Sequence, residues 1–272
     1  MHAFFIAIIL GIVEGVTEFL PISSTGHLII AQDALSFKDN HDLFTVVVQL
    51  GAIAAVVWFY REDLLHKIAG LFQADREALN FWKLLVIATI PAGIVGLLLD
   101  KSMETITTPL VVGISLIIGG IVLWLVDRKP VPTTAKEQKA EFKAISVKRA
   151  FLVGLAQCVA IIPGVSRSGA TIVGGLATGL NRPTATAFSF YLSIPVLILA
   201  SAYKLYKYGG ELHTLPGGAT SLAVGLVAAF ITALASISWL LHYISRHNFT
   251  LFAYYRIGMG VLILFLLGIN VL

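Results

Sequence analysis

Two carboxylates close to the start of the chain are spaced for joint chemistry. Glu14 and Glu18 are four residues apart in an apolar stretch, so a helix would place both on one face. Two like charges side by side in a low dielectric repel unless a divalent cation, an arginine or a shared proton compensates them. The structural alternative is a polar contact between helices or a position at the membrane interface. We expect the pair to be functional, because ionisable groups inside apolar segments are costly.

The residues that follow these carboxylates suit an anion, and phosphate above all. Pro21 would end the first helix, and Ser23 or Ser24 would cap the next one, whose free N–H groups favour an anion. Ser24 and His27 are three residues apart, a spacing that would allow a nucleophile and its proton shuttle within one turn. Further candidates for substrate binding are Ser23 and the two residues between Ser24 and His27, which are Thr25 and Gly26. The same run is also a plain capping sequence, and the histidine could be a packing residue.

A second cluster, at 163–171, brings an arginine and more hydroxyls. Arg167 follows a Pro-Gly pair in an apolar stretch, where it needs an anionic partner, and its planar guanidinium suits a carboxylate or a phosphate. Neighbours that could bind the same anion are Ser166, Ser168, Gly169 and Thr171. The structural alternative is an ion pair between Arg167 and Glu14 or Glu18. Together the two clusters suit metal-assisted phosphoryl transfer, in which catalysis is positioning and charge neutralisation.

Other polar residues in apolar stretches are weaker candidates. Gln49 could form a hydrogen bond between helices or lie beside the site, where it would bind substrate. Gln157 could face the same cavity as Glu14. Arg256, near the start of the last apolar stretch, is interpreted as a side chain that snorkels or pairs at the interface.

The composition indicates a membrane protein. Of the 272 residues 57% are hydrophobic and 12% charged, and the mean hydropathy is +0.89, whereas soluble domains carry about 25% charged residues. So little charge excludes a cytosolic enzyme, a disordered chain and a nucleic-acid binder, despite a pI near 9.2. A single cysteine excludes an internal disulfide. The first apolar run has no Lys or Arg before it and is interrupted by glutamates, so we do not expect a signal peptide.

The apolar stretches predict six transmembrane helices and two re-entrant hairpins. The six long stretches lie at 43–60, 81–99, 109–126, 186–206, 219–243 and 250–271. Four shorter pieces lie at 3–20, 23–32, 147–162 and 169–180. Because each pair of short pieces is joined by a Pro- and Ser-containing break, we expect each pair to enter the membrane and return on the same side.

An internal repeat supports this organisation. Residues 11–14 align with 154–157, and Ser23-Ser24-Thr25-Gly26 then falls on Ser166-Arg167-Ser168-Gly169 without a gap, at an offset of about half the chain. We expect one membrane domain over 1–272, with repeat 1 at about 1–126, repeat 2 at about 147–272 and a solvated cytoplasmic loop at 127–146. Three spans per half would invert the second repeat, as in many secondary transporters.

The charges predict the orientation. The loops at 61–80, 127–149, 181–185 and 244–249 hold twelve Lys and Arg residues against four on the other side, which places these loops in the cytoplasm. Both termini and the base of the first hairpin would then face outward, and the second hairpin would enter from the cytoplasm.

The two clusters resemble the motifs of the undecaprenyl pyrophosphate phosphatase family, also called the bacitracin-resistance family. That family carries a Glu-x-x-x-Glu-Phe-Leu-Pro-x-Ser-Ser-Thr-Gly-His block and a Pro-Gly-x-Ser-Arg-Ser-Gly-x-Thr block. Both are complete here, at 14–27 and 163–171, and the resemblance covers essentially the whole chain. The Lys-x6-Arg-Pro and Ser-Arg-x5-His blocks of the other membrane lipid phosphatase superfamily are absent from the sequence.

The resemblance implies a role for each motif residue. It implies that Glu14 and Glu18 serve metal and proton chemistry, with Mg²⁺ or Ca²⁺ as the divalent cation. It implies that Ser24 and His27 lie at the reacting phosphate. It also implies that Arg167 binds the diphosphate, in a site open to the external, periplasmic side of the bacterial inner membrane.

The resemblance further implies the substrate, a C55 isoprenyl diphosphate that is released as the monophosphate lipid carrier of cell-wall synthesis. Many relatives carry acidic residues at two further positions, which here are Ala187 and Thr45, so a role for a third carboxylate is not expected. We therefore expect an all-α polytopic membrane protein that is a metal-dependent undecaprenyl-diphosphate phosphatase, with membrane lipids and no nucleic acid as partners. Water in place of Ser24 as nucleophile, a transporter or flippase for a phosphorylated lipid, and a homodimer are left open.

Overall fold

The computed structural model describes residues 2–128 and 139–271, which form helices and short 3₁₀ turns with no strand among them. The helices are α1 (His2–Thr17), α2 (Ser24–Ala34), α3 (Leu43–Phe59), α4 (Arg61–Phe72), α5 (Arg76–Ile106), α6 (Pro109–Val126), α7 (Val147–Cys158), α8 (Arg167–Ala177), α9 (Arg182–Tyr208), α10 (Gly218–Ile244) and α11 (Thr250–Gly268). The 3₁₀ turns are η1 (Asn40–Asp42), η2 (Phe142–Ala144), η3 (Val159–Ile161) and η4 (Gly209–Thr214).

Among the described residues, six stretches are long and apolar enough to cross a membrane. They are Asn40–Phe59, Arg76–Leu99, Pro109–Val126, Arg182–Thr214, Gly218–Ile244 and Thr250–Gly268. Each contains or closely matches one of the six predicted spans. The prediction of an all-α polytopic membrane protein is confirmed.

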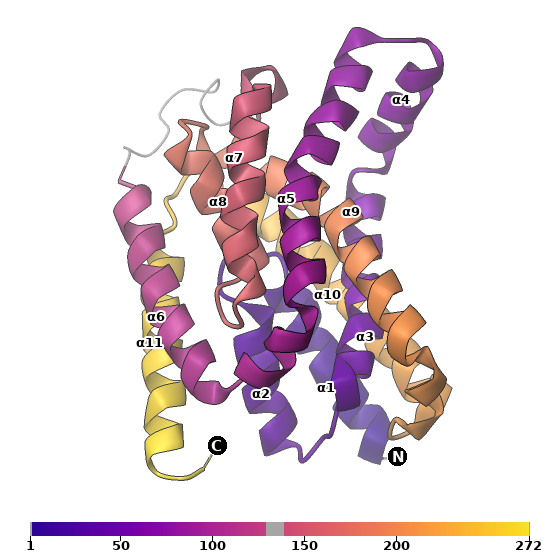
Figure 1. Cartoon of the computed structure of the whole chain (residues 1–272), viewed down its shortest axis with the longest axis vertical. Helices are drawn as coiled ribbons and strands as arrows, with labels where there is room; N and C mark the ends of the chain where they lie inside the picture. Colours follow the sequence, from indigo (N-terminus) through magenta and orange to yellow (C-terminus); the bar gives the residue numbers. More distant parts are fainter. Residues whose placement is uncertain (1, 129–138, 272) are drawn as a thin grey trace.

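The four shorter apolar pieces form two helical pairs. α1 with α2 makes the first pair, and α7 with η3 and α8 makes the second. Figure 1 shows α7 and α8 entering from the end of the molecule that carries α4, and α1 and α2 entering from the opposite end. The turns of the two pairs meet inside the molecule, where the Ser168 hydroxyl donates to the Leu20 carbonyl at 2.9 Å. The re-entrant path through a bilayer stays a prediction.

The residue before the second helix of each pair has the same unusual backbone. Ser23 has φ 70° and Ser166 has φ 73°, in the left-handed region that non-glycine residues rarely occupy. Such a conformation costs about 1–3 kcal/mol and persists only where the surroundings hold it. The two positions are equivalent in the predicted repeat, so strain is stored at matching points of both turns.

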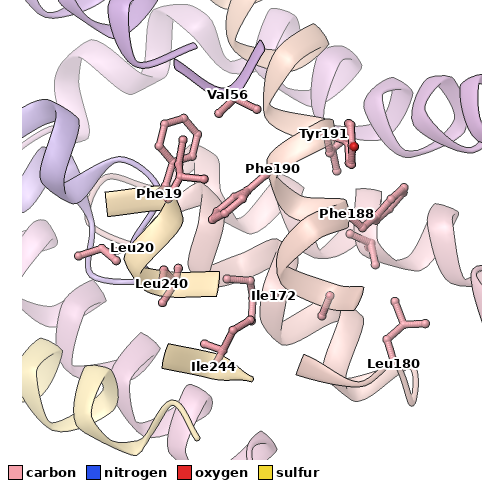
Figure 2. Close-up of a cluster of buried hydrophobic side chains, with 14 of the residues drawn as sticks. Phe19, Leu20, Val56, Ile172, Leu180, Phe188, Phe190, Tyr191, Leu240 and Ile244 are labelled. Atoms are coloured by element: carbon pink, nitrogen blue, oxygen red, sulfur yellow. The ribbon is translucent and has the colours of Figure 1, made fainter. Parts of the chain in front are cut away.

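An aromatic and aliphatic cluster holds the first turn in place (Figure 2). Phe19, which follows Glu18, is fully buried and meets Phe190 of α9 edge to face, with ring centroids 5.3 Å apart. Ile172 of α8 and Leu240 of α10 belong to the same cluster. Close packing is what holds helices together in a membrane, so this cluster joins the first turn to three other elements.

Small residues let the helices approach one another closely. α1 lies along α10, where a Cβ on Gly15 would collide with the backbone of Ala229. Backbones that approach this closely are typical of membrane helix interfaces. The position of Glu14, next to Gly15, is therefore set by α10.

The predicted loop at 61–80 is wrong in part, because it contains α4 and the start of α5. The sequence favours a helix there: acidic residues occupy the first turn, and Asp63 pairs with Lys67 one turn later at 2.9 Å. The Trp82 indole donates to the Lys67 carbonyl at 3.2 Å and ties α4 to α5.

The prediction that 127–149 is a solvated loop is also wrong in part. Asp127 and Arg182 are buried and form an ion pair at 2.6 Å. Asp127 also accepts the Phe249 N–H at 2.6 Å, so it joins α6, α9 and the start of α11. A buried charge requires such a partner. Residues 129–138 of the predicted loop lie outside the described residues.

The first turn of α1 and the last turn of α11 lie at one end of the molecule, and α4 lies at the other (Figure 1). The assignment of these ends to the two sides of a membrane stays a prediction.

Candidate active site

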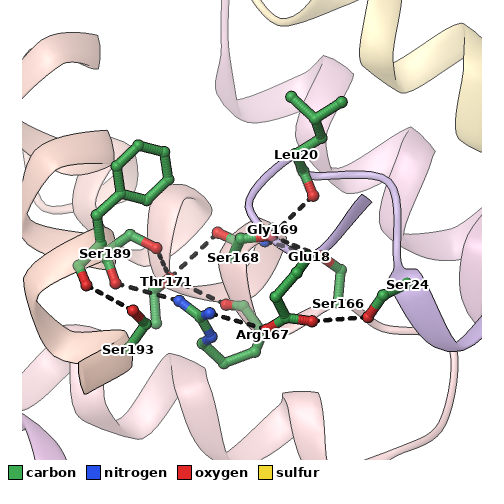
Figure 3. Close-up of polar contacts among 11 residues, drawn as sticks. Glu18, Leu20, Ser24, Ser166, Arg167, Ser168, Gly169, Thr171, Ser189 and Ser193 are labelled. Carbon is green, nitrogen blue, oxygen red and sulfur yellow. Dashed lines mark hydrogen bonds and ion pairs between the residues drawn. The ribbon is translucent and has the colours of Figure 1, made fainter. Parts of the chain in front are cut away.

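Glu18 joins the two turns through one carboxylate (Figure 3). The Ser24 hydroxyl donates to Glu18 Oε2 at 2.7 Å, and Arg167 Nη2 donates to Glu18 Oε1 at 2.9 Å. The side chains of the ion pair are only 6% and 10% exposed, so water screens them little. The carboxylate therefore contacts a hydroxyl of the first turn and a guanidinium of the second.

Arg167 is held in this position by more than its ion pair. Its Nη1 donates to the Ser189 carbonyl of α9 at 3.2 Å, and its guanidinium carbon lies 5.6 Å from the centre of the Phe19 ring. The Nε atom is buried and has no hydrogen-bond partner. The ion pair proposed as the structural alternative is thus present with Glu18, and the Nε–H is without a partner.

Glu14 is a buried carboxylate without a hydrogen-bond partner on either oxygen. It is 1% exposed, and its charged neighbours are Glu18 and Arg167. An uncompensated carboxylate in this setting requires a cation or a proton. Its chemistry therefore fits a divalent cation.

The residues available for such a cation are few. No group of three or more His, Cys, Asp or Glu side chains that could hold a metal occurs in the described parts of the chain. Mg²⁺ commonly binds to one or two protein carboxylates and completes its shell with water and substrate phosphates. Glu14 and Glu18 suit that mode, whereas an all-protein cage is not present among the described residues.

A cavity of about 330 Å³ lies between the two turns. Among the predicted site residues, its wall holds Glu14, Glu18, Ser23, Ser24, Thr25, Gln49, Ser166 and Arg167. Ser24 and Thr25 stand in the uncapped first turn of α2, because Ser23 precedes the helix without a side-chain cap bond. Ser23 thus occupies the predicted N-cap position of α2 but its hydroxyl forms no capping hydrogen bond, and the N–H groups there remain available for an anion.

Three other predicted residues of the second cluster are not part of the cavity wall: Ser168, Gly169 and Thr171. Ser166 caps α8 by accepting the Gly169 N–H at 3.1 Å and contacts Ser168 at 3.0 Å. The Thr171 hydroxyl lies 2.6 Å from the Ser189 hydroxyl and donates to the Arg167 carbonyl. These contacts fix the turn that presents Arg167.

His27 points away from Ser24. Its Nδ1 lies 2.8 Å from the Ser23 carbonyl and its Nε2 lies 2.7 Å from the Tyr255 hydroxyl. A carbonyl only accepts, so Nδ1 carries the proton and Nε2 accepts from Tyr255. The predicted Ser24–His27 pair does not form, because α2 turns Ser24 toward the cavity and His27 toward α11. The neighbouring Gly26 packs on α6, where a Cβ would lie 3.0 Å from Leu116.

Arg256 is the residue that the sequence interpretation placed wrongly. It is 1% exposed instead of snorkelling, and its guanidinium donates to the carbonyls of Val165 at 2.8 Å, Pro21 at 3.2 Å and Gly164 at 3.3 Å. It also lies 3.5 Å from the Ser115 carbonyl of α6. Arg256 therefore donates to backbone carbonyls of both turns and holds the two turns together.

The mouth of the cavity adds a cation that the sequence reading did not select. The Lys204 amine donates to Asp42 at 2.6 Å and to the His41 carbonyl at 3.1 Å, and Lys204 lines the cavity. Nearby, Asp39 accepts the N–H of Phe44 at 2.7 Å and so holds the start of α3. Burial raises the pKa of the Asp39 carboxyl, while its hydrogen bonds act in the opposite direction.

Fold and site together define a class: a polytopic helical membrane protein in which two hairpin turns place carboxylates, a serine and an arginine around one buried cavity. The family model described as bacitracin resistance protein BacA matches residues 7–262. The chain belongs to this family.

Curated relatives agree over nearly the full length. The chain is 48% identical over 264 residues to "Undecaprenyl-diphosphatase 1" of Paraburkholderia xenovorans, covering 95% of this chain and 93% of that protein. It is 49% identical over 265 residues to "Undecaprenyl-diphosphatase" of Nitrosomonas europaea, covering 95% and 92%. A protein of the same name from Nitrosospira multiformis is 47% identical over 259 residues, covering 94% and 92%.

Proposed function

We propose that this chain is an integral-membrane phosphatase that removes the terminal phosphate of undecaprenyl diphosphate. The product, undecaprenyl phosphate, would return to use as the cell-wall lipid carrier, and the activity would confer resistance to bacitracin. The observation that carries the proposal is Glu18, whose two oxygens contact the Ser24 hydroxyl and the Arg167 guanidinium at the wall of one cavity. Family membership and the names of the relatives support the substrate.

Ser24 is the nucleophile in this proposal. Its oxygen attacks the terminal phosphorus, its proton passes to Glu18 Oε2, and the bond from that phosphorus to the bridging oxygen breaks. The electron pair leaves with the lipid monophosphate. A water molecule then attacks the phosphoserine and gives a proton to a carboxylate. The Ser24 oxygen takes back the proton held by Glu18 as its bond to phosphorus breaks, and inorganic phosphate leaves.

The remaining groups neutralise charge and hold positions. Arg167 and the free N–H groups at the start of α2 bind phosphate oxygens, where developing charge is stabilised by donors that are already in place. Glu14 and Glu18 would hold Mg²⁺ or Ca²⁺, which when bound would neutralise the diphosphate and polarise its terminal phosphorus. His27 positions the turn through the Ser23 carbonyl instead of acting as the proton acceptor for Ser24.

The site would open on the external side of the bacterial inner membrane. Asp42, an exposed residue of the cavity wall, lies directly before α3, which begins toward the end of the molecule opposite α4 (Figure 1). Most of the Lys and Arg residues of the predicted loops belong to the other end, and such residues favour the cytoplasmic side. Labelling of single cysteines placed at each end, in intact cells, would test the orientation.

The decisive experiment measures phosphate release from C55 and C15 isoprenyl diphosphates by the purified protein, with and without EDTA. We expect release that EDTA abolishes, a loss of at least about a hundredfold in kcat for Glu18→Gln and Ser24→Ala, and a trapped phosphoenzyme. Ser245→Ala, a change at a serine near the end of α10, should keep wild-type activity.

Three results would contradict parts of the proposal. Near-normal turnover by Ser24→Ala without a phosphoenzyme would make water the nucleophile. Phosphate release that EDTA does not affect would exclude a requirement for a divalent cation. Binding of the lipid without any phosphate release would make the chain a carrier for a phosphorylated lipid.

A further inference from the structure

A second cavity begins where the catalytic cavity ends. It has a volume of about 530 Å³ and lies between α5 and α9, with η3 at its head. Its wall is mainly apolar and includes Ala92, Gly93, Leu97, Val196 and Leu199. Gly93, Leu97 and Leu199 are exposed, so the groove opens on the lipid-facing surface between two spans.

This α5–α9 groove is continuous with the catalytic cavity. Both cavities are lined by Ala160, Ile161, Arg167, Leu197, Ala200 and Lys204. The two therefore form one elongated space with a polar end at Glu18 and an apolar end between the helices. A ligand that fills both ends must have an anionic head and an apolar tail.

Buried polar atoms without partners mark the head of the groove. Gln157 is 2% exposed, and neither atom of its side-chain amide has a hydrogen-bond partner. The Nε of Arg167 is unpartnered as well, and both residues line the groove. Unpaired polar atoms in an apolar wall are costly, so a ligand that brings acceptor oxygens to this point would be favoured.

We propose that the α5–α9 groove binds the first isoprene units of the substrate, with the phosphate that stays on the lipid placed at Gln157 and Arg167. The proposal rests on the diphosphatase activity proposed above, and it adds the path that the isoprenoid chain of the substrate takes. Cavities of about 300–1,000 Å³ bury ligands of drug size, so the groove holds the start of a C55 chain and the rest lies in the bilayer. The substrate thus enters sideways from the membrane.

The structure supplies a substitution that fills the groove without disturbing the fold. A Cβ on Gly93 or Gly96 would meet no other atom within 4 Å, although both glycines line the groove. Gly93→Phe and Gly96→Leu therefore place the added side chain in open space. Because glycine has a low helix propensity, replacing it should not destabilise α5. Gly258 of α11 is equally open and lies away from the groove, so Gly258→Phe is the matched control.

The experiment compares kcat/KM for C55 and C15 diphosphates with that for dimethylallyl diphosphate, whose chain is too short to extend along the groove. A substrate that can no longer bury two of its CH₂ groups in the groove should bind about tenfold more weakly. We expect Gly93→Phe and Gly96→Leu to lower kcat/KM by at least about tenfold on the long substrates. Activity on the short substrate should stay near wild type, and Gly258→Phe should leave all three substrates unchanged.

Two outcomes would overturn the groove while leaving the phosphatase intact. One is wild-type kcat/KM for both groove variants on C55 and C15 diphosphates. The other is an equal loss on long and short substrates, because blocking the chain path must spare the short one. A wild-type protein that releases no phosphate from any of the three would instead refute the activity, and the groove proposal with it.

Discussion

Replacing Arg256 with methionine would remove the guanidinium that holds both turns from behind. Arg256 donates to the carbonyls of Pro21 in the first turn and of Gly164 and Val165 in the second. Methionine keeps an unbranched apolar stem and leaves these carbonyls without their donor. The test is whether the turns still meet with the same geometry around Glu18.

The expected effect on stability is small because two terms oppose each other. Hydrogen bonds inside membrane proteins average ~0.6 kcal/mol and reach ~1.7, so losing three costs ~2–5 kcal/mol in the free energy of unfolding. An arginine at the centre of a membrane helix costs ~2.5–3.5 kcal/mol on the insertion scale, and methionine removes that cost. We expect the net change in the free energy of unfolding to lie between a gain of ~1.5 and a loss of ~2.5 kcal/mol.

The expected effect on turnover is larger. Arg167 and Ser24 belong to different turns and meet only through Glu18, so their separation depends on how the turns are held. A displacement of about 1 Å at reacting groups costs about a hundredfold in rate. We therefore expect kcat of Arg256→Met to fall by about tenfold to a hundredfold.

The assay combines phosphate release with thermal unfolding in the same detergent. Arg256→Lys keeps the charge but has one compact ammonium group, so its kcat should fall between those of wild type and Arg256→Met. Arg128→Met, which removes an exposed arginine that stacks on Trp124 at the end of α6, should leave kcat unchanged. Wild-type kcat in Arg256→Met would refute the reasoning, and unfolding at the assay temperature would make Arg256 a folding residue instead.

Three further predictions concern the single residues Glu14, Tyr255 and Gln157. Glu14→Gln should weaken binding of Mg²⁺ or of the spin probe Mn²⁺ by about tenfold or more, since ligand-sphere changes have effects of that size; unchanged titration of the apo protein would exclude Glu14 as a ligand. Tyr255→Phe removes the hydroxyl that donates to His27, a bond worth ~1 kcal/mol, so kcat should fall about fivefold; a pH–rate profile identical to wild type with full kcat would contradict this. Gln157→Leu should raise KM by about three- to tenfold with kcat retained, whereas a lower kcat at constant KM would place Gln157 at the reacting phosphate.

Several features of the fold could be read from the chain because their causes are local. A run of apolar residues long enough to cross hydrocarbon is a span wherever it packs, so all six were predicted. A proline followed by serines breaks a helix through its own geometry, so both turns were located. The charged residues of these turns were selected because burying them is costly wherever they lie.

Other features depend on which side of a helix faces which neighbour. Sequence spacing allowed Ser24 to pair with His27, but the rotation of α2 directs Ser24 to Glu18 and His27 to Tyr255. Periodicity within one helix defines angles between its own side chains and says nothing about the partner helix that each side chain meets. The hydrogen-bond partners of Ser24 and His27 could therefore not be predicted from the sequence.

The class of protein, its spans, its two broken hairpins and the charged residues Glu14, Glu18 and Arg167 of the cavity wall could be predicted from the sequence. The tertiary structure alone decided that Arg256 lies behind the turns, that Lys204 reaches the mouth, and that a groove between α5 and α9 joins the catalytic cavity. Each of these brings together residues far apart in the chain. Their contacts depend on the angles at which helices cross and on how closely small residues let the helices approach. Neither hydropathy nor motif spacing predicts these angles and distances.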